Sequence, residues 1–67
     1  MDISAKFGKR VRVIRLQKRM SQGDVAKKLG VSINYVSQIE RGIENLSLKS
    51  VEKLARALGV GLDRLIR

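Results

Sequence analysis

The sequence predicts an all-α protein whose five short helices pack into one compact domain. Three observations lead to this fold class. Apolar residues recur three and four positions apart along nearly the whole chain, Ser and Gly residues flank the apolar runs, and there is no Pro. A single Phe and a single Tyr leave little of the aromatic content that strands favour. Because 67 residues suit one domain, we expect a single domain over residues 1–67.

The first helix is expected to begin after an N-cap at Ser4 and to end near Lys18. Phe7, Val11 and Ile14 follow the spacing of one buried face, so they form its predicted core stripe.

Two apolar residues of this helix, Val13 and Leu16, point away from that stripe and are expected to be exposed. A small exposed apolar pair is ordinary on a protein surface, but it also suits a partner surface, and the pattern leaves both open.

The second helix is predicted to begin at Ser21, where the carboxylate of Asp24 can meet the free amides of the first turn. Gly30 ends it in the left-handed conformation that glycine favours. Its inward residues are expected to be Val25, Ala26 and Leu29.

Three further helices follow. Ser32 and Gly42 bound the third, Ser47 and Gly59 bound the fourth, and residues 62–66 form a short fifth. The expected inward residues of the third and fourth helices are Val36 and Ile39, then Leu48, Val51, Leu54, Ala55 and Leu58. The fifth helix is predicted from the spacing of Leu62, Leu65 and Ile66.

The composition excludes several function classes. Without Cys or His the chain has no disulfides, no Cys/His zinc site and no Ser-His or Cys-His catalytic pair. No apolar run approaches the roughly 20 residues of a membrane span, and no signal peptide opens the sequence. We therefore expect a cytoplasmic binding protein without catalysis, metal or cofactor.

The charge predicts a polyanionic partner. The net charge is +9, and residues 1–28 carry nine basic side chains against two acidic ones, whereas residues 29–67 carry six against four. Neutralising phosphates releases counterions and drives association, which favours nucleic acid. Two alternatives stay open: a helical protein-interaction module whose charge is incidental, and a membrane-surface peptide. Glycines that end short helices disfavour the latter.

Residues 22–41 match a helix-turn-helix. Gly30 supplies the positive φ of a tight turn, and Ala26 is small enough for the two axes to cross closely. The side chains expected to be buried by this unit are Val25, Leu29, Val31, Val36 and Ile39.

The segments FGKRVRVIRLQKRMSQGDVAKKLGVSINYVSQIERG and NLSLKSVEKLARALGV resemble the Xre family of helix-turn-helix regulators, whose DNA-binding domains are phage-repressor-like. The landmarks that carry the resemblance are Gly8, Val11, Arg15, Ser21, Gln22, Ala26, Gly30 and residues 35–42. The variant NLS at 45–47, together with the small size, is similar to controller proteins of restriction–modification systems.

The resemblance implies a transcriptional regulator that binds double-stranded DNA sequence-specifically. We expect it to bind a palindromic operator as a homodimer, because one reading helix contacts only about four to six base pairs, too few for specificity against a genome. Further expectations are a location at the nucleoid and RNA polymerase as a second partner. A stand-alone phage-type or antitoxin-type repressor is the alternative within the same class.

At about 100° per residue, the edge of the third helix opposite Val36 and Ile39 is polar. Asn and Gln amides there can pair with adenine in the major groove, although a solvated helix face has the same composition. Ile33 either contacts a thymine methyl or shields the helix start, and Tyr35 either contacts DNA or packs on the core rim. The expected base-contacting residues are Ile33, Asn34, Tyr35, Ser37 and Gln38.

Phosphates are expected at the amide-rich starts of the second and fourth helices and along basic side chains nearby. In the family, the residue that matches Gln22 bonds a phosphate and braces the third helix. The full expected set is Gln22, Arg41, Asn45, Ser47, Lys49, Lys18, Arg19 and Lys27.

Two further expectations concern the structure. The resemblance implies a partly buried ion pair between Arg15 and Glu40. Surplus apolar residues supply a candidate dimer interface, with core closure as the alternative for Leu62 and Leu65. The interface candidates are Ile43, Leu62, Leu65 and Ile66.

Overall fold

The computed structural model describes residues 3–66, with side chains from residue 5 onward, and within this range it contains helices and no strand. The elements are α1 (Ile3–Gln17), α2 (Gln22–Leu29), α3 (Ile33–Glu40), α4 (Leu48–Leu58) and α5 (Leu62–Ile66). The predicted all-α, five-helix architecture is confirmed, and the fifth helix has the predicted bounds.

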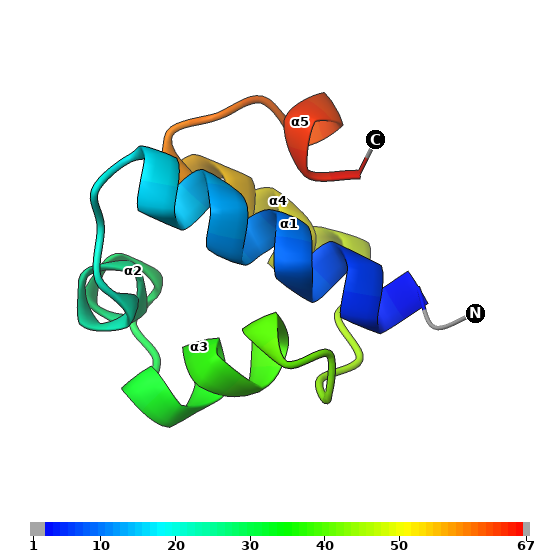
Figure 1. The fold of residues 1–67 in the computed structure, drawn as a ribbon, viewed down its shortest axis with the longest axis horizontal. Helices are drawn as coiled ribbons and strands as arrows, with labels where there is room; N and C mark the ends of the chain where they lie inside the picture. The colour runs from blue at the N-terminus through cyan, green and yellow to red at the C-terminus, as the bar shows by residue number, and fades with distance from the viewer. Residues whose placement is uncertain (1–2, 67) are drawn as a thin grey trace.

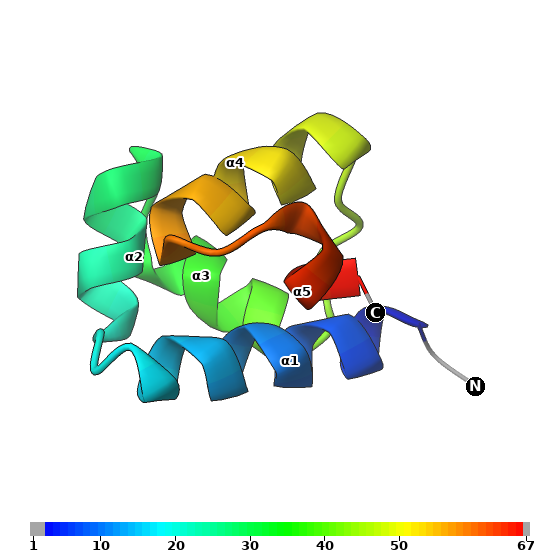
Figure 2. The ribbon, with the colours of Figure 1, turned by 90° about the horizontal axis from the view of Figure 1, so that it is seen from above.

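The five helices surround one core, with α1 along one side (Figure 1). α3 and α5 lie on opposite sides of α1 in this view, and α3 packs against both α1 and α2. Figure 2 shows α4 across the core from α1, where it packs against α2 and α5. This arrangement leaves one flank of α3 at the edge of the molecule.

Serine caps begin three of the helices. The hydroxyl oxygens of Ser21, Ser32 and Ser47 accept hydrogen bonds from backbone N–H groups three residues further on, at 2.9, 3.1 and 3.2 Å. These bonds satisfy amide groups that have no partner inside the helix. The predicted starts of α2, α3 and α4 are therefore confirmed.

The ends of α1, α2, α3 and α4 share one pattern of two backbone hydrogen bonds, and at each end one residue has a left-handed conformation. At the end of α2, the N–H of Gly30 bonds the Lys27 carbonyl and the N–H of Val31 bonds the Ala26 carbonyl. The left-handed residues are Arg19, Gly30, Gly42 and Gly59, with φ between 57° and 76°. At the other three helix ends the left-handed residue is a glycine, whereas after α1 it is Arg19, which has a side chain.

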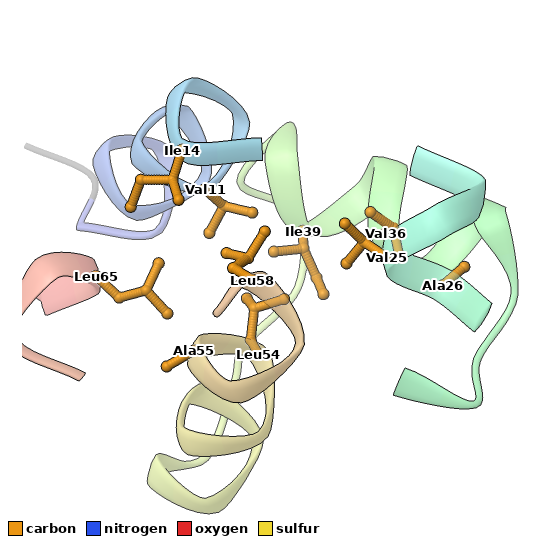
Figure 3. Packing of buried hydrophobic residues seen from close by; sticks show 10 residues of the cluster. All are labelled: Val11, Ile14, Val25, Ala26, Val36, Ile39, Leu54, Ala55, Leu58 and Leu65. Carbon is orange, nitrogen blue, oxygen red and sulfur yellow. The ribbon is translucent and has the colours of Figure 1, made fainter. Parts of the chain in front are cut away.

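The core is a single cluster of ten buried apolar residues contributed by all five helices (Figure 3). Val11, Val25 and Val36 are fully buried, and Leu54 and Leu58 of α4 lie against them from the opposite side. Leu65 closes the cluster from α5. The predicted stripes of α1, α2 and α3 therefore meet in one place.

The start of α1 and the end of α3 approach closely because each contributes a glycine to the contact, Gly8 in α1 and Gly42 just after α3. A Cβ atom on Gly8 would lie 2.4 Å from the Ile39 carbonyl oxygen, and one on Gly42 would lie 2.7 Å from the Cα of Ala5. No side chain fits at either position without displacing backbone. The start of α1 is thus held against the end of α3.

Three expectations about individual residues are wrong. α1 already includes Ser4, so Ser4 does not precede the helix as its N-cap, and its side chain lies outside the described residues. Val31 is 38% exposed because it lies in the surface turn after Gly30. Leu48 is 65% exposed because α4 begins at the rim of the bundle, clear of α2 and α5 (Figure 2).

Candidate nucleic-acid interface

The start of α2 is fixed by a reciprocal pair of hydrogen bonds between Ser21 and Asp24. The Asp24 N–H donates to the Ser21 hydroxyl oxygen at 2.9 Å, and the Ser21 N–H donates to the Asp24 carboxylate at 2.8 Å. The backbone hydrogen bond from Ser21 is the main cause that holds the pKa of Asp24 below its usual range, followed by the bond to the Ser21 side chain. This capping box orients the first turn of α2, where Gln22 lies.

The turn between α2 and α3 has the geometry that the sequence predicts. Gly30 has φ 75° and ψ 34°, a left-handed conformation, and Ser32 caps α3 two residues later. Ala26 of α2 is buried, and α2 packs against α3. The helix-turn-helix of residues 22–41 therefore forms a packed unit with α1 behind it.

α3 buries one side and exposes the other. Val36 and Ile39 are buried in the core, whereas Asn34 is exposed. Ser37 and Gln38 are half-buried, and neither makes a side-chain hydrogen bond to another residue of the described range. Every fully buried side-chain nitrogen or oxygen of the described residues has a hydrogen-bond partner. Since the polar atoms of Ser37 and Gln38 have none, they are not fully buried and remain accessible to a ligand.

The two border residues of α3 differ in their surroundings. Ile33 is 57% exposed, but its side chain also lies beside Gly23, since a Cβ built there would be 3.5 Å from the Ile33 Cδ1. Tyr35 is half-buried and packs against the core cluster. Core packing thus holds the Tyr35 ring, while most of Ile33 stays open to solvent.

A buried polar network ties α3 to α1 and α2. Arg15 donates from Nε to Glu40 Oε2 at 2.6 Å and from Nη2 to Glu40 Oε1 at 3.1 Å. Its third bond, from Nη1, goes to the Met20 carbonyl at 2.9 Å. Gln22 donates from Nε2 to Glu40 Oε1 at 3.2 Å. Glu40, on the last turn of α3, therefore receives donors from two other helices.

Gln22 has a second N–H group on the same nitrogen and an amide oxygen besides the bond to Glu40. Its position in the first turn of α2 places these groups beside free backbone amides and the positive end of the helix dipole. Sequence reasoning reached this bracing role only through the resemblance, because the partners are 18 residues apart.

The other expected phosphate-contacting residues fall into separate groups. Lys18 and Arg19 are exposed after α1, and Lys27 is exposed in the last turn of α2, at the opposite end from Gln22. A third exposed group, between the end of α3 and the first turn of α4, contains Arg41, Asn45, Ser47 and Lys49. Ser47 already bonds Ser50 as the α4 cap.

The dimer-interface candidates are divided by burial. Ile43 and Ile66 are each 58% exposed, and Leu62 is half-buried against the core. Leu65 is 1% exposed, so its assignment to an interface is wrong: it fills the core of its own chain. Leu48, which periodicity alone placed inward, adds an exposed apolar side chain beyond the expected set.

Other kinds of site find no support in the described range. Residues 3–66 hold no group of three His, Cys, Asp or Glu side chains arranged for a metal ion. None of their helices has the length and apolar character needed to cross a bilayer. The flank of α3 with its basic surroundings remains the principal candidate site.

Comparisons with known proteins give a consistent result. Residues 11–65 match the profile of a family described as helix-turn-helix. The chain is 47% identical over 60 residues to the control protein C.BamHI of Bacillus amyloliquefaciens, covering 88% of this chain and 74% of that protein. The crystal structure of the restriction–modification controller protein C.AhdI from Aeromonas hydrophila superposes with a TM-score of 0.86 at 41% identity, covering 91% and 92% of the two chains.

A third similar structure contains DNA. It is the tetramer of the restriction–modification controller protein C.Esp1396I in complex with its natural 35 base-pair operator. Its chain superposes with a TM-score of 0.83 at 29% identity, covering 100% of the present chain and 99% of that one.

Proposed function

Because the chain belongs to the helix-turn-helix family, we propose that it is a sequence-specific transcriptional regulator that binds double-stranded operator DNA through α3. The observation that carries this proposal is the outer edge of α3. Asn34 is exposed, and the polar groups of Ser37 and Gln38 are accessible, on a helix that a buried network holds rigidly against α1 and α2. Rigid presentation matters because base discrimination depends on hydrogen-bond geometry.

In this proposal, α3 lies in the major groove with Asn34, Ser37 and Gln38 toward the base edges. Ile33 contributes its exposed methyl groups to an apolar contact such as a thymine methyl, and Tyr35 lies at the groove wall. The phosphate contacts come from the side chains that flank this edge and from the helix starts. The proposed phosphate-contacting residues are Gln22, Arg41, Asn45, Ser47 and Lys49, together with Lys18, Arg19 and Lys27.

We assign the active form to a homodimer. One α3 contacts too few base pairs for specificity against a genome, whereas a two-fold dimer doubles the site and requires a palindrome with half-sites about 34 Å apart. Exposed Ile43 and Ile66 are the proposed interface residues, with Leu62 at its edge. Substituting Ile66 by Asp should then convert dimers to monomers in sedimentation equilibrium, while the exposed Val31→Asp variant should not.

The relatives support a proposal about the kind of genes that are regulated. C.BamHI is a control protein, and C.AhdI is a restriction–modification controller protein. We propose that the present chain likewise controls restriction–modification genes, with action at the nucleoid in the cytoplasm and RNA polymerase as a second partner. Regulation of transcription by DNA binding needs no cofactor, and we assign no catalysis to the chain.

The proposal is tested by selecting bound fragments from random duplex DNA and measuring affinity against salt. We expect a palindromic consensus, and a slope of log affinity against log salt of about −0.9 for each phosphate contacted. A protein-interaction module with incidental charge would enrich no consensus sequence. That result would reject the proposed function.

A further inference from the structure

A groove between α1 and α5 lies on the side of the molecule away from α3. Its volume is about 540 Å³. In Figure 1, α5 lies above α1 and α3 lies below it. The lining residues are Lys6, Lys9, Arg10, Val13, Ile14, Gln17, Asp63 and Arg64. None of them belongs to the DNA-binding set proposed above, so the groove has no role in the proposed function.

The groove is strongly basic. Four cationic side chains, Lys6, Lys9, Arg10 and Arg64, line it with a single carboxylate, Asp63. Within residues 3–66 none of the four makes an ion pair with a carboxylate, since the ion pair found there joins Arg15 and Glu40. Their charge is therefore available to a ligand and favours an acidic one.

The two arginines are held in position by hydrogen bonds that join α1 to α5. Arg10 donates from Nη1 to the Arg64 carbonyl at 3.2 Å, and Arg64 donates from Nη2 to Gln17 Oε1 at 3.2 Å. Each guanidinium has five N–H donors, so each keeps four beyond these bonds. Arginines that are already oriented lose less entropy when they bind a carboxylate.

An apolar strip, formed by Val13 and Leu16, runs along α1 from the groove. Val13 lines it and is 52% exposed, and Leu16 lies one helical turn further along α1 and is 54% exposed. The proposed DNA contacts use neither residue. Adjacent exposed apolar side chains surrounded by cations are typical of a surface that binds protein.

We propose that the α1–α5 groove is a docking site for an acidic amphipathic segment of a partner protein. The carboxylates of such a segment pair with Lys6, Lys9, Arg10 and Arg64, and its apolar side chains cover Val13 and Leu16. A small anion or a second DNA duplex would satisfy the cations but would leave the apolar strip in water. Of these occupants, only the protein segment complements both features.

The location permits docking on DNA-bound protein. α3 and α5 lie on opposite sides of α1 (Figure 1), so a segment in the groove does not block the edge of α3. This separation also allows the docking to be tested independently of DNA binding, on free protein as well as on the complex.

The test uses three synthetic 15-residue peptides carrying the same fluorophore. The first peptide has Glu on one face of a helix and Leu on the other. The second has the same Glu residues with Ser in place of Leu. The third has Lys in place of the Glu residues of the first. Binding is measured by fluorescence anisotropy on free protein and on protein saturated with selected DNA. Backbone amide shifts in NMR spectra locate the site.

We expect the Glu/Leu peptide to bind both forms, at least about tenfold more tightly than the Glu/Ser peptide, with shifts confined to residues 6–17 and 62–66. The double variant Val13→Ser/Leu16→Ser should weaken it by about tenfold, and Lys6→Gln/Lys9→Gln by a similar factor. The matched charge control, Lys53→Gln/Arg56→Gln, removes two cations from a groove between α2 and α4 and should leave its affinity within about twofold.

Several results would overturn the proposal. The first is that the Glu/Leu peptide does not bind, or binds no more tightly than the Glu/Ser peptide. The second is that the amide shifts are centred on α3. The third is that the Lys53→Gln/Arg56→Gln control weakens binding as much as Lys6→Gln/Lys9→Gln does. Shifts on α3 in free protein that disappear when DNA is bound would mean that the peptide only mimics a polyanion. None of these results bears on whether the protein binds an operator, because that is measured separately.

Discussion

The Arg15 guanidinium and the Glu40 carboxylate form a two-bond ion pair, at 2.6 and 3.1 Å, that is almost completely buried between α1 and α3. Glu40 also accepts a bond from Gln22, so one carboxylate on α3 connects all three helices that surround the candidate DNA-binding edge. The orientation of α3 therefore depends on a polar contact as well as on the apolar core.

Substituting Glu40 by Ala should lower the free energy of unfolding by about 3–5 kcal/mol, because the Arg15 charge would remain buried without its partner. DNA binding should be lost with the fold. Urea denaturation measures the change, and Glu52→Ala, at an exposed position of α4, should shift stability by no more than about 0.5 kcal/mol. An unchanged midpoint for Glu40→Ala would refute the structural role of the pair.

Gly30→Ala and Gly42→Ala should differ in severity although both positions have positive φ. A Cβ on Gly30 meets nothing within 4 Å, so only the left-handed conformation is strained, at about 1–2 kcal/mol. A Cβ on Gly42 would also strike the backbone of Ala5 at 2.7 Å, so we expect a clearly larger loss. Thermal melting of the two variants, compared in one buffer, checks the order. Equal losses would mean that the start of α1 moves away at no cost.

Arg19→Gly should stabilise the fold and weaken DNA binding. Arg19 has φ 57°, a conformation that disfavours side chains by about 1–2 kcal/mol, whereas glycine adopts it readily. The loss of a proposed phosphate contact should reduce the salt slope by about 1 and weaken all DNA sequences alike. Melting and salt titrations of the same variant measure the two effects. A variant that is stabilised but keeps its salt slope would remove Arg19 from the phosphate set.

Gln38→Ala should reduce discrimination between the selected operator and unrelated DNA by about 1–3 kcal/mol while leaving the fold intact. The reason is that its amide is proposed to bond a base edge, which carries sequence information, rather than a phosphate. Competition binding measures the ratio of specific to non-specific affinity. Lys18→Ala serves as the comparison, since a phosphate contact should weaken both affinities together. If Gln38→Ala behaved like Lys18→Ala, the base contact would be disproved.

Asp24→Asn should lower stability at neutral pH but not in strong acid. The hydrogen bonds from Ser21 hold the pKa of Asp24 below its ordinary value of 3.8, so the ionised carboxylate stabilises the folded state. That contribution is fully present above the unfolded pKa and is lost as the pH falls through the lower folded pKa. The difference between wild type and variant should therefore be constant above about pH 5 and shrink below about pH 4. A difference that grows in acid would contradict this assignment.

Within the site, the sequence indicated the exposed edge of α3 correctly at Asn34, because the helical period alone places it opposite Val36 and Ile39. The half-burial of Ser37 and Gln38 follows from the packing of α3 against α1 and α2, which no local pattern contains. The α1–α5 groove was likewise not predictable as a site. Its cations come from positions up to 58 residues apart in the chain, from Lys6 to Arg64.

The sequence by itself determined the number of helices, their bounds to within a residue or two, and the caps at Ser21, Ser32 and Ser47. Those features depend on hydrogen bonds and periodicity among residues only a few positions apart. The tertiary structure alone decided that Leu65 fills the core while Leu48 lies in solvent, although both occupy apolar positions of their helices. Burial depends on which neighbouring helix covers a position. α5 packs against both α1 and α4, whereas the first turn of α4 lies at the rim of the bundle, clear of α2 and α5.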